Sequence, residues 1–218
     1  TAAAVKHAEA AGAGNFSLLS AHKLTPPVLA ALLAEEVLID AFVCPGHVTT
    51  ITGTDLYRPL TDAGKPCVVS GFEPLDILSS VLMIVRQFNR GAAVTEMEYS
   101  RVASAAGNAR AREIMNDVFE PRDAVWRGLG LLKGGGLKVG RKYARFDAEE
   151  VFGARARGDE KETPGCICDK VLRGMKKPSD CKLFGTACVP ENPVGACMVS
   201  DEGTCSVYYR FKGRTLAA

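Results

Sequence analysis

The sequence predicts an α/β protein in which a parallel-sheet domain is followed by a small cysteine-rich module. Over roughly the first 120 residues, short apolar segments alternate with helical segments, which is typical of a parallel sheet with helices on both faces. Six of the 8 cysteines then fall between residues 166 and 205. The chain therefore divides into a sheet domain and a module whose structure depends on its thiols.

The predicted strands are short and apolar, and proline and glycine mark where helices begin and end. We expect strands at residues 16–20, 37–43, 66–71 and 92–98. We expect helices at residues 26–35, 72–91 and 108–119. The second helix has Pro74 near its first position and Gly91 at its end, as helix boundaries favour.

Three loops leave the predicted carboxyl edge of this sheet, at residues 20–23, 44–48 and 70–74. They carry most of the reactive side chains of this half, namely His22, Lys23, Cys44, His47 and Glu73. Open α/β sheets bind ligands at that edge. We therefore take His47 and Glu73 as candidate functional residues of the rim. The alternative is that these loops only make turns. Cys44 lies in a rim loop, whereas Cys67 begins a strand and is expected to be buried.

The composition of the sequence changes after the sheet domain. We place domain boundaries at 1–122 for the α/β domain, 123–160 for glycine-rich strands with a charged connector, and 161–218 for the cysteine module. Three consecutive glycines, 134–136, resemble a phosphate loop. They lack the following Lys-Ser/Thr and helix, so a nucleotide site is not expected.

Charge and hydropathy exclude several classes of function. The formal net charge is +2, so bulk electrostatic binding to nucleic acid or an anionic membrane is not expected. No apolar run approaches the length needed to span a bilayer. The sequence shows no secretory signal pattern, and we expect a cytoplasmic protein. In a reducing compartment, clustered cysteines more often bind metal or carry out redox chemistry than form structural disulfides.

The spacing of the six late cysteines matches neither a zinc ribbon nor a bacterial ferredoxin. One, twelve, six, eight and seven residues separate Cys166, Cys168, Cys181, Cys188, Cys197 and Cys205. Six thiols exceed the four that one tetrahedral metal or one cubane cluster needs. The partitions that remain are four ligands plus one cysteine pair, or three disulfides, and a zinc-stabilised tail is a further alternative. Apolar and glycine neighbours favour a buried cluster.

Several stretches of the chain closely resemble the hydrogenase maturation HypD family. They occur in the same order and cover nearly the whole chain: "NFSLLSAHK", "CPGHVTTITG", "PCVVSGFEPLDIL", "WRGLG", "FDAEEVF" and "GCICDKVLRGMKKPSDCKLFGTACVPENPVGACMVSDEGTCSVYYR". The resemblance implies a maturation scaffold with redox chemistry, rather than a turnover enzyme, that assembles the Fe(CN)2CO unit of nickel–iron hydrogenases. It implies a HypC-like small chaperone and a HypE-like cyanide donor as partners.

The same resemblance implies roles for the six late cysteines. Four of them correspond to the ligands of a 4Fe–4S cluster, namely Cys166, Cys181, Cys188 and Cys205. The other two, Cys168 and Cys197, correspond to a redox-active pair that can close as a disulfide. The family fold has two similar α/β domains and a C-terminal module similar to that of ferredoxin:thioredoxin reductase.

The start of the sequence departs from the family pattern. Family members carry an early Cys-Gly-x-His-Thr-His motif, a Gly-Pro-Gly-Cys-Pro-Val-Cys stretch and a Gly-Phe-Glu-Thr-Thr stretch, and none occurs here. We therefore expect Thr1 to lie at the start of the second α/β domain. Two alternatives remain for the function: a stand-alone thiol–disulfide oxidoreductase of the ferredoxin:thioredoxin reductase type, and a zinc-stapled binding module.

Overall fold

The computed structural model describes residues 1–154 and 164–211 of this chain. The α-helices are α1 Ala2–Ala10, α2 Thr25–Leu33, α3 Gly46–Thr52, α4 Arg58–Asp62, α5 Pro74–Asn89, α6 Ala109–Val118, α7 Ala148–Phe152, α8 Cys168–Leu172, α9 Ala196–Val199 and α10 Thr204–Phe211. The strands are β1 Phe42–Pro45, β2 Cys67–Ser70, β3 Thr95–Met97, β4 Phe119–Trp126 and β5 Gly130–Val139. Short 3-10 helices are η1 Asp55–Tyr57, η2 Arg141–Phe146 and η3 Pro178–Asp180.

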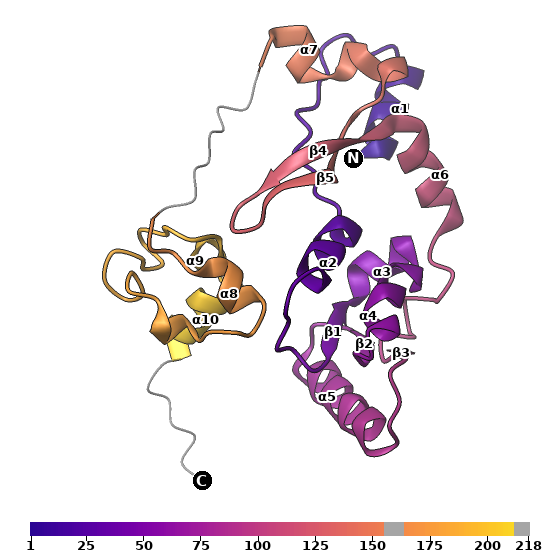
Figure 1. Cartoon of the computed structure of the whole chain (residues 1–218). Helices are drawn as coiled ribbons and strands as arrows, with labels where there is room; N and C mark the ends of the chain where they lie inside the picture. The colour runs from indigo at the N-terminus through magenta and orange to yellow at the C-terminus, as the bar shows by residue number, and fades with distance from the viewer. Residues whose placement is uncertain (155–163, 212–218) are drawn as a thin grey trace.

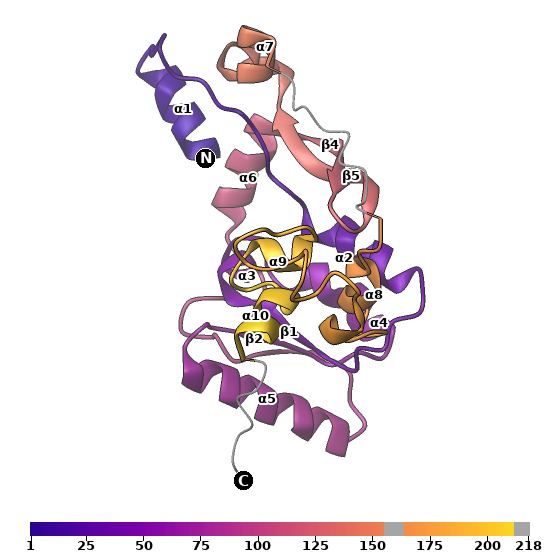
Figure 2. The same cartoon turned by 90° about the vertical axis from the view of Figure 1, so that its left-hand side faces the viewer.

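The α/β prediction is confirmed by a parallel sheet with strand order β1-β2-β3. Helix α5 lies on one side of this sheet, and α3 and α4 lie on the other (Figures 1 and 2). The first of these strands is shorter and later than predicted, because regular pairing begins only at Phe42 and continues into Pro45. The other two strands fall inside the predicted segments.

Helix α5 begins at Pro74 and ends just before Gly91, as the sequence predicts. Its amphipathic pattern is inverted. The residues buried against the sheet are polar, namely Asp76, Ser80 and Gln87, whereas the outer face carries exposed leucines such as Leu75 and Leu78. Gln87 bridges two backbone groups: its Nε2 donates to the carbonyl oxygen of Cys67 (3.3 Å), and its Oε1 accepts from the amide of Val94 (3.0 Å). The helix is therefore fixed to the sheet by hydrogen bonds.

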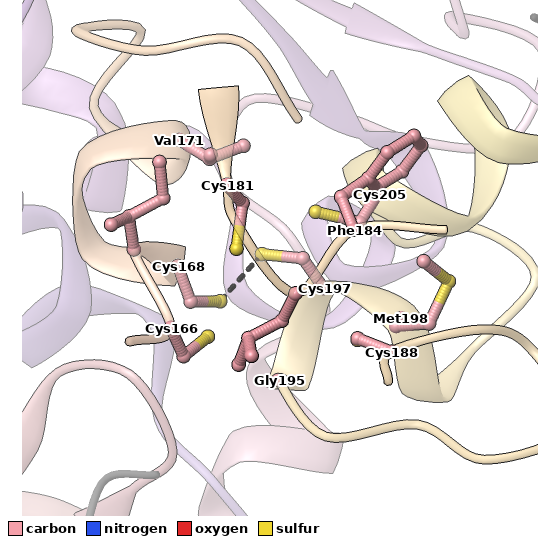
Figure 3. A pocket seen from close by; sticks show the side chains of 12 residues that line it. Cys166, Cys168, Val171, Cys181, Phe184, Cys188, Gly195, Cys197, Met198 and Cys205 are labelled. Carbon is pink, nitrogen blue, oxygen red and sulfur yellow. Dashed lines mark hydrogen bonds between the residues drawn. The ribbon is translucent and has the colours of Figure 1, made fainter. Parts of the chain in front are cut away.

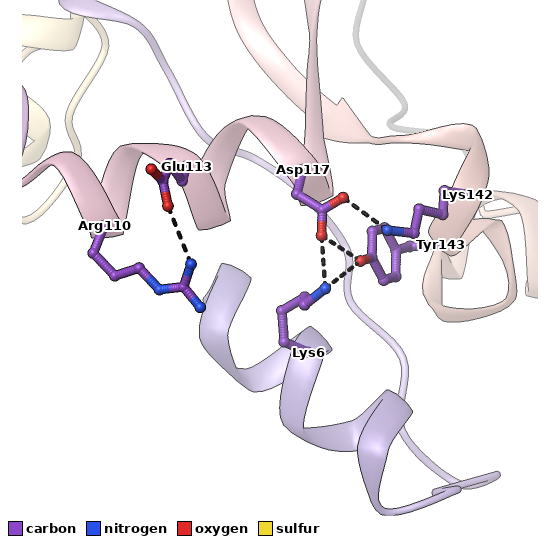
Figure 4. Close-up of polar contacts among 6 residues, drawn as sticks. All are labelled: Lys6, Arg110, Glu113, Asp117, Lys142 and Tyr143. Carbon is purple, nitrogen blue, oxygen red and sulfur yellow. Dashed lines mark hydrogen bonds and ion pairs between the residues drawn. The ribbon is translucent and has the colours of Figure 1, made fainter.

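A second core lies around the antiparallel hairpin that β4 and β5 form. Its buried residues come from α1, the end of α6, the two hairpin strands and η2: Ala2, Val5, Ala8, Val118, Phe119, Val139, Tyr143 and Phe146. Asp117 accepts hydrogen bonds beside this core from Lys6 (2.7 Å), Lys142 (2.8 Å) and Tyr143 (2.6 Å), as Figure 4 shows. Helix α1 is thus tied to the segment that follows β5, across 137 positions of sequence between Lys6 and Tyr143.

Two predictions about the start of the chain are wrong. Residues 16–20 do not join the parallel sheet; they meet the chain at an isolated bridge between Leu18 and Asp147. The loop at residues 20–23 does not lie at the carboxyl edge either. Lys23 pairs with Gly136 of β5, and the ring of His22 packs on Phe119 with centroids 5.0 Å apart. Residues 20–23 therefore pack on the hairpin strands and not on the parallel sheet.

The cysteine module consists of short helices and turns (yellow and orange in Figure 1). Its contact with the sheet domain includes an ion pair between Arg173 and Glu35 and a hydrogen bond from the amide of Leu38 to the carbonyl oxygen of Arg173 (2.9 Å). Residues 155–163 of the predicted charged connector lie outside the described residues. Among the residues that are described, no helix combines the length and apolar character needed to cross a membrane.

Candidate thiol site

All six late cysteines line one cavity in the module. The cavity contains about 320 Å³ of space free of atoms, part of it open to solvent. Its other lining residues are apolar or glycine: Ile167, Val171, Leu183, Phe184, Gly195 and Met198. The cysteines come from α8, α9 and α10, from the turn before α8 and from the segment between α8 and α9, and they lie around one volume (Figure 3). Thiols up to 39 positions apart in the sequence are therefore gathered in one apolar enclosure.

Two of these thiols form a close pair. The Sγ atoms of Cys168, at the start of α8, and Cys197, in α9, lie 2.7 Å apart (Figure 3). Both side chains are buried, with 6% and 5% of their surface exposed. The hydrogen bond with Cys197 lowers the pKa of Cys168 to about 7, although burial acts in the opposite direction. A thiol with a depressed pKa is the nucleophilic member of a dithiol.

Cys197 lies between its pair partner and a third thiol. Hydrogen bonds with Cys168 and then Cys205, followed by burial, raise the pKa of Cys197, so it is the proton donor of the group. The hydrogen bond with Cys197 in turn lowers the pKa of Cys205. Burial raises the pKa of Cys166. Cys197 is thus in contact both with its partner and with one of the predicted cluster ligands.

The donor set and its backbone fit an iron–sulfur cluster. A Cβ added to Gly195 would stand 2.7 Å from the Sγ of Cys166, so only glycine lets the backbone approach this sulfur so closely. The amide of Val194 donates to the Sγ of Cys188 at 3.4 Å. Close backbone approach and N–H···S hydrogen bonds are means by which proteins stabilise such clusters and tune their potential.

The thiols surround a volume rather than meet at a point. Within residues 1–154 and 164–211, no three His, Cys, Asp or Glu side chains converge closely enough for a single metal ion. A cubane cluster has four irons, and each thiolate ligand binds a different one. Its ligands therefore need to line an enclosure, which is the arrangement that these cysteines have.

The second predicted site is at the carboxyl edge of the parallel sheet. A Cβ added to Gly46 would stand 2.5 Å from the carbonyl oxygen of Ser70, so the start of α3 lies close against the end of β2. The exposed ring of His47 lies between Phe72 and Tyr99, with centroids 5.1 Å and 5.7 Å away. Glu73 is exposed in the next loop, and its amide donates to Asp76 (3.3 Å). The predicted loop at residues 44–48 is instead the end of β1 and the start of α3, so the structure places His47 in the first turn of α3 and Glu73 just before α5, at one edge of the sheet.

The other two cysteines lie in the core of the sheet domain. Cys44 and Cys67 are both buried, together with Leu29, Tyr57 and Leu60. A hydrogen bond with Cys67, and then burial, raises the pKa of Cys44. A buried thiol with a raised pKa is unreactive. The prediction that Cys44 lies in a rim loop is wrong, because Cys44 is part of β1 and its side chain belongs to the core.

Sequence reasoning did not identify the ion pairs that brace this edge. Both guanidinium nitrogens of Arg101 bind the carboxylate of Asp76, at 2.9 Å and 2.6 Å, and the guanidinium also lies 4.5 Å from the ring centroid of Tyr99. The hydrogen bond with Arg101 holds the pKa of Asp76 below its usual range. The acidic residue at the third position of a helix is a sequence signal for a cap. No local pattern identifies an arginine 25 residues later as its partner.

Fold and site together define a class: an α/β protein that carries a six-thiol, apolar enclosure suited to an iron–sulfur cluster beside a dithiol. Comparison with known proteins gives the family. The HypD family model, described as "Hydrogenase formation hypA family", matches residues 1–212. A putative hydrogenase expression/formation protein of Methanocaldococcus jannaschii is 50% identical over 202 residues, which is 91% of this chain and 55% of that protein.

Two relatives with the printed name hydrogenase maturation factor HypD extend the match. The one from Azotobacter vinelandii is 42% identical over 219 residues, covering 97% of this chain and 58% of the relative. The one from Cupriavidus necator is 44% identical over 230 residues, covering 100% of this chain and 60% of the relative. The chain belongs to the HypD family. It spans between 55% and 60% of the length of these relatives.

Proposed function

We propose that this chain serves in the maturation of nickel–iron hydrogenase, where its cysteine module holds a 4Fe–4S cluster next to a redox-active dithiol. The cluster ligands are Cys166, Cys181, Cys188 and Cys205, and the dithiol is Cys168 with Cys197. The observation that carries the proposal is the arrangement of all six thiols around one apolar cavity, with the sulfurs of Cys168 and Cys197 2.7 Å apart. Family membership supports the biological setting.

The dithiol supplies two electrons and two protons when it closes. Cys168 and Cys197 each lose a proton and one electron as their sulfurs bond, and the reverse step returns two thiols. A 4Fe–4S cluster, when bound, supplies or takes up electrons one at a time. Cys197 holds the proton at its Sγ, and its hydrogen bond stabilises the thiolate of Cys168. These two residues therefore have the unequal acidities that a reactive dithiol needs.

The cargo of this chemistry is the Fe(CN)2CO unit of the hydrogenase, which we treat as the substrate. A HypC-like chaperone and a HypE-like cyanide donor are the proposed partners. The rim residues His47 and Glu73 are candidates for the face that meets this unit. Support for the rim comes from their exposure, in the first turn of α3 and just before α5, at the edge where open α/β sheets bind ligands.

Iron loading tests the proposed cluster. Anaerobic reconstitution with iron and sulfide is expected to give about four irons per chain and a broad visible absorption, as a cubane cluster requires. Cys181→Ser is expected to lose the iron because a ligand is removed. The matched variant Cys168→Ser is expected to keep the iron and lose the disulfide.

Two outcomes contradict this assignment. Stoichiometric zinc without iron uptake would support the zinc-stapled alternative. Loss of iron in Cys168→Ser with retention in Cys181→Ser would reverse the roles of the two cysteines. Iron analysis, the visible spectrum and a thiol count on each variant distinguish these results.

A further inference from the structure

The tip of the β4–β5 hairpin lies directly on the thiol of Cys168. A Cβ added to Gly128, in the turn between the two strands, would stand 3.3 Å from the Sγ and 3.4 Å from the Cβ of Cys168. Gly128 also has a φ of +84°, a conformation that side chains rarely adopt. Both views of the molecule show the hairpin tip beside α8 (Figures 1 and 2). The turn therefore favours glycine at this position, and a side chain there would press on the sulfur beneath it.

Hydrogen bonds brace the hairpin up to its turn. The Nζ of Lys23 donates to the carbonyl oxygen of Val125 (2.6 Å), and the indole of Trp126 donates to that of Gly135 (3.0 Å). The turn itself is closed by the amide of Leu129, which donates to the carbonyl oxygen of Trp126 (2.9 Å). These bonds hold the strands up to the turn, so the tip is presented to Cys168 as an ordered element.

We propose that the hairpin tip is a cover for the Cys168–Cys197 dithiol, with Gly128 as the positioning residue that lets it close. A thiol or disulfide from solution must reach the sulfur that it attacks. With Cys168 only 6% exposed under the tip, bulky thiol reagents and protein disulfides are excluded until the tip moves. While the tip is closed, the dithiol can exchange electrons only through the face that it turns toward the other four thiols of the cavity.

The function of this cover rests on the proposed redox role of the dithiol. Whether the hairpin tip limits access to Cys168 does not depend on that role. The access of a reagent to Cys168 can be measured on the reduced protein, with or without iron. A failure of the cover would leave the iron count and the disulfide unchanged. Loss of iron binding, conversely, would leave the difference in thiol access measurable.

The test compares two glycines of the same turn region. Gly130 also has a positive φ, +75°, but a Cβ there would meet nothing within 4 Å. Gly128→Val and Gly130→Val therefore share the backbone strain, and only Gly128→Val presses on Cys168. Reduced full-length chain, with and without iron, is alkylated with iodoacetamide and with a bulky polymer-linked maleimide. Mass spectrometry then gives the labelling rate of each cysteine.

The readout is the ratio of the bulky to the small reagent at Cys168. A change in thiol acidity alters both rates together, whereas access alters mainly the bulky one. We expect this ratio to rise roughly five-fold or more in Gly128→Val, as local opening of a cover produces, and to stay at the wild-type value in Gly130→Val. Cys44, in the core of the parallel-sheet domain, would become labelled if the whole fold were destabilised, and we expect it to stay protected.

An unchanged ratio in Gly128→Val overturns the proposal, and so does an equal rise in Gly130→Val or at Cys44. If valine prevents folding, Gly128→Ala with Gly130→Ala provides the same comparison with a single added carbon. The direction expected is the same, with a smaller rise. Equal ratios in the two alanine variants overturn the proposal as well.

Discussion

At the scale of single residues, sequence spacing was enough to single out six thiols but not their surroundings. The count of cysteines, with apolar and glycine neighbours, favoured a buried cluster; the structure gathers the six thiols around one cavity, and the cluster stays a prediction. The close approaches of Gly195 to Cys166 and Gly128 to Cys168 could not be predicted, because each depends on how a distant backbone is placed.

Asp117 offers a residue-scale prediction about stability. Hydrogen bonds from Lys142, Lys6 and Tyr143 hold the pKa of Asp117 well below its usual range. A carboxyl with a depressed pKa stabilises the fold above its unfolded value, about 3.9, and this contribution is lost as the pH falls further. We expect Asp117→Asn to lower the Tm at pH 7 by roughly 3 °C, on the scale of one lost charge-assisted hydrogen bond.

The pH dependence and a neighbouring pair provide the controls for Asp117. The difference in Tm between wild type and Asp117→Asn should narrow as the pH falls below 4. Glu113→Gln on the same helix removes an exposed ion pair with Arg110 and should leave the Tm nearly unchanged (Figure 4). Equal effects of the two substitutions at pH 7 would show that the Asp117 cluster does not hold α1 in place.

At the scale of elements, the best predictions were those with strong boundary signals. Helix α5 and strand β2 were predicted because proline, glycine and a continuous apolar run mark them. Residues 16–20 were predicted as a strand of the sheet on the same kind of run. Leu18 instead forms an isolated bridge with Asp147, about 130 positions away in the sequence, and no local sequence pattern predicts a partner that distant.

Helix α5 gives an element-scale prediction because its buried face is polar. Gln87 is 0% exposed and satisfies two backbone groups, so Gln87→Ala is expected to lower the free energy of unfolding by about 1–3 kcal/mol. Leu78 is 67% exposed, and Leu78→Ala should change it by less than about 0.5 kcal/mol. Urea denaturation measures both. A larger loss in Leu78→Ala would contradict this orientation of α5.

At the scale of the whole molecule, the contacts that unite the parts are long-range. Arg173 of the module pairs with Glu35 across 138 positions, and Gly174 approaches Leu38 so closely that a Cβ would stand 2.7 Å from its carbonyl oxygen. The hairpin tip adds a contact near the other end of α8. Helix α8, which carries Cys168, is thus held at both ends by segments of the sheet domain and its hairpin.

The division of the six cysteines into four ligands and one dithiol is the central claim, and one peptide map tests it. Iron-loaded, oxidised chain is alkylated without reductant, digested and mapped before and after the iron is removed. We predict a disulfide between Cys168 and Cys197, with Cys166, Cys181, Cys188 and Cys205 protected until the iron is stripped. A disulfide that includes any of those four, or protection of Cys168 as a ligand, would contradict the account.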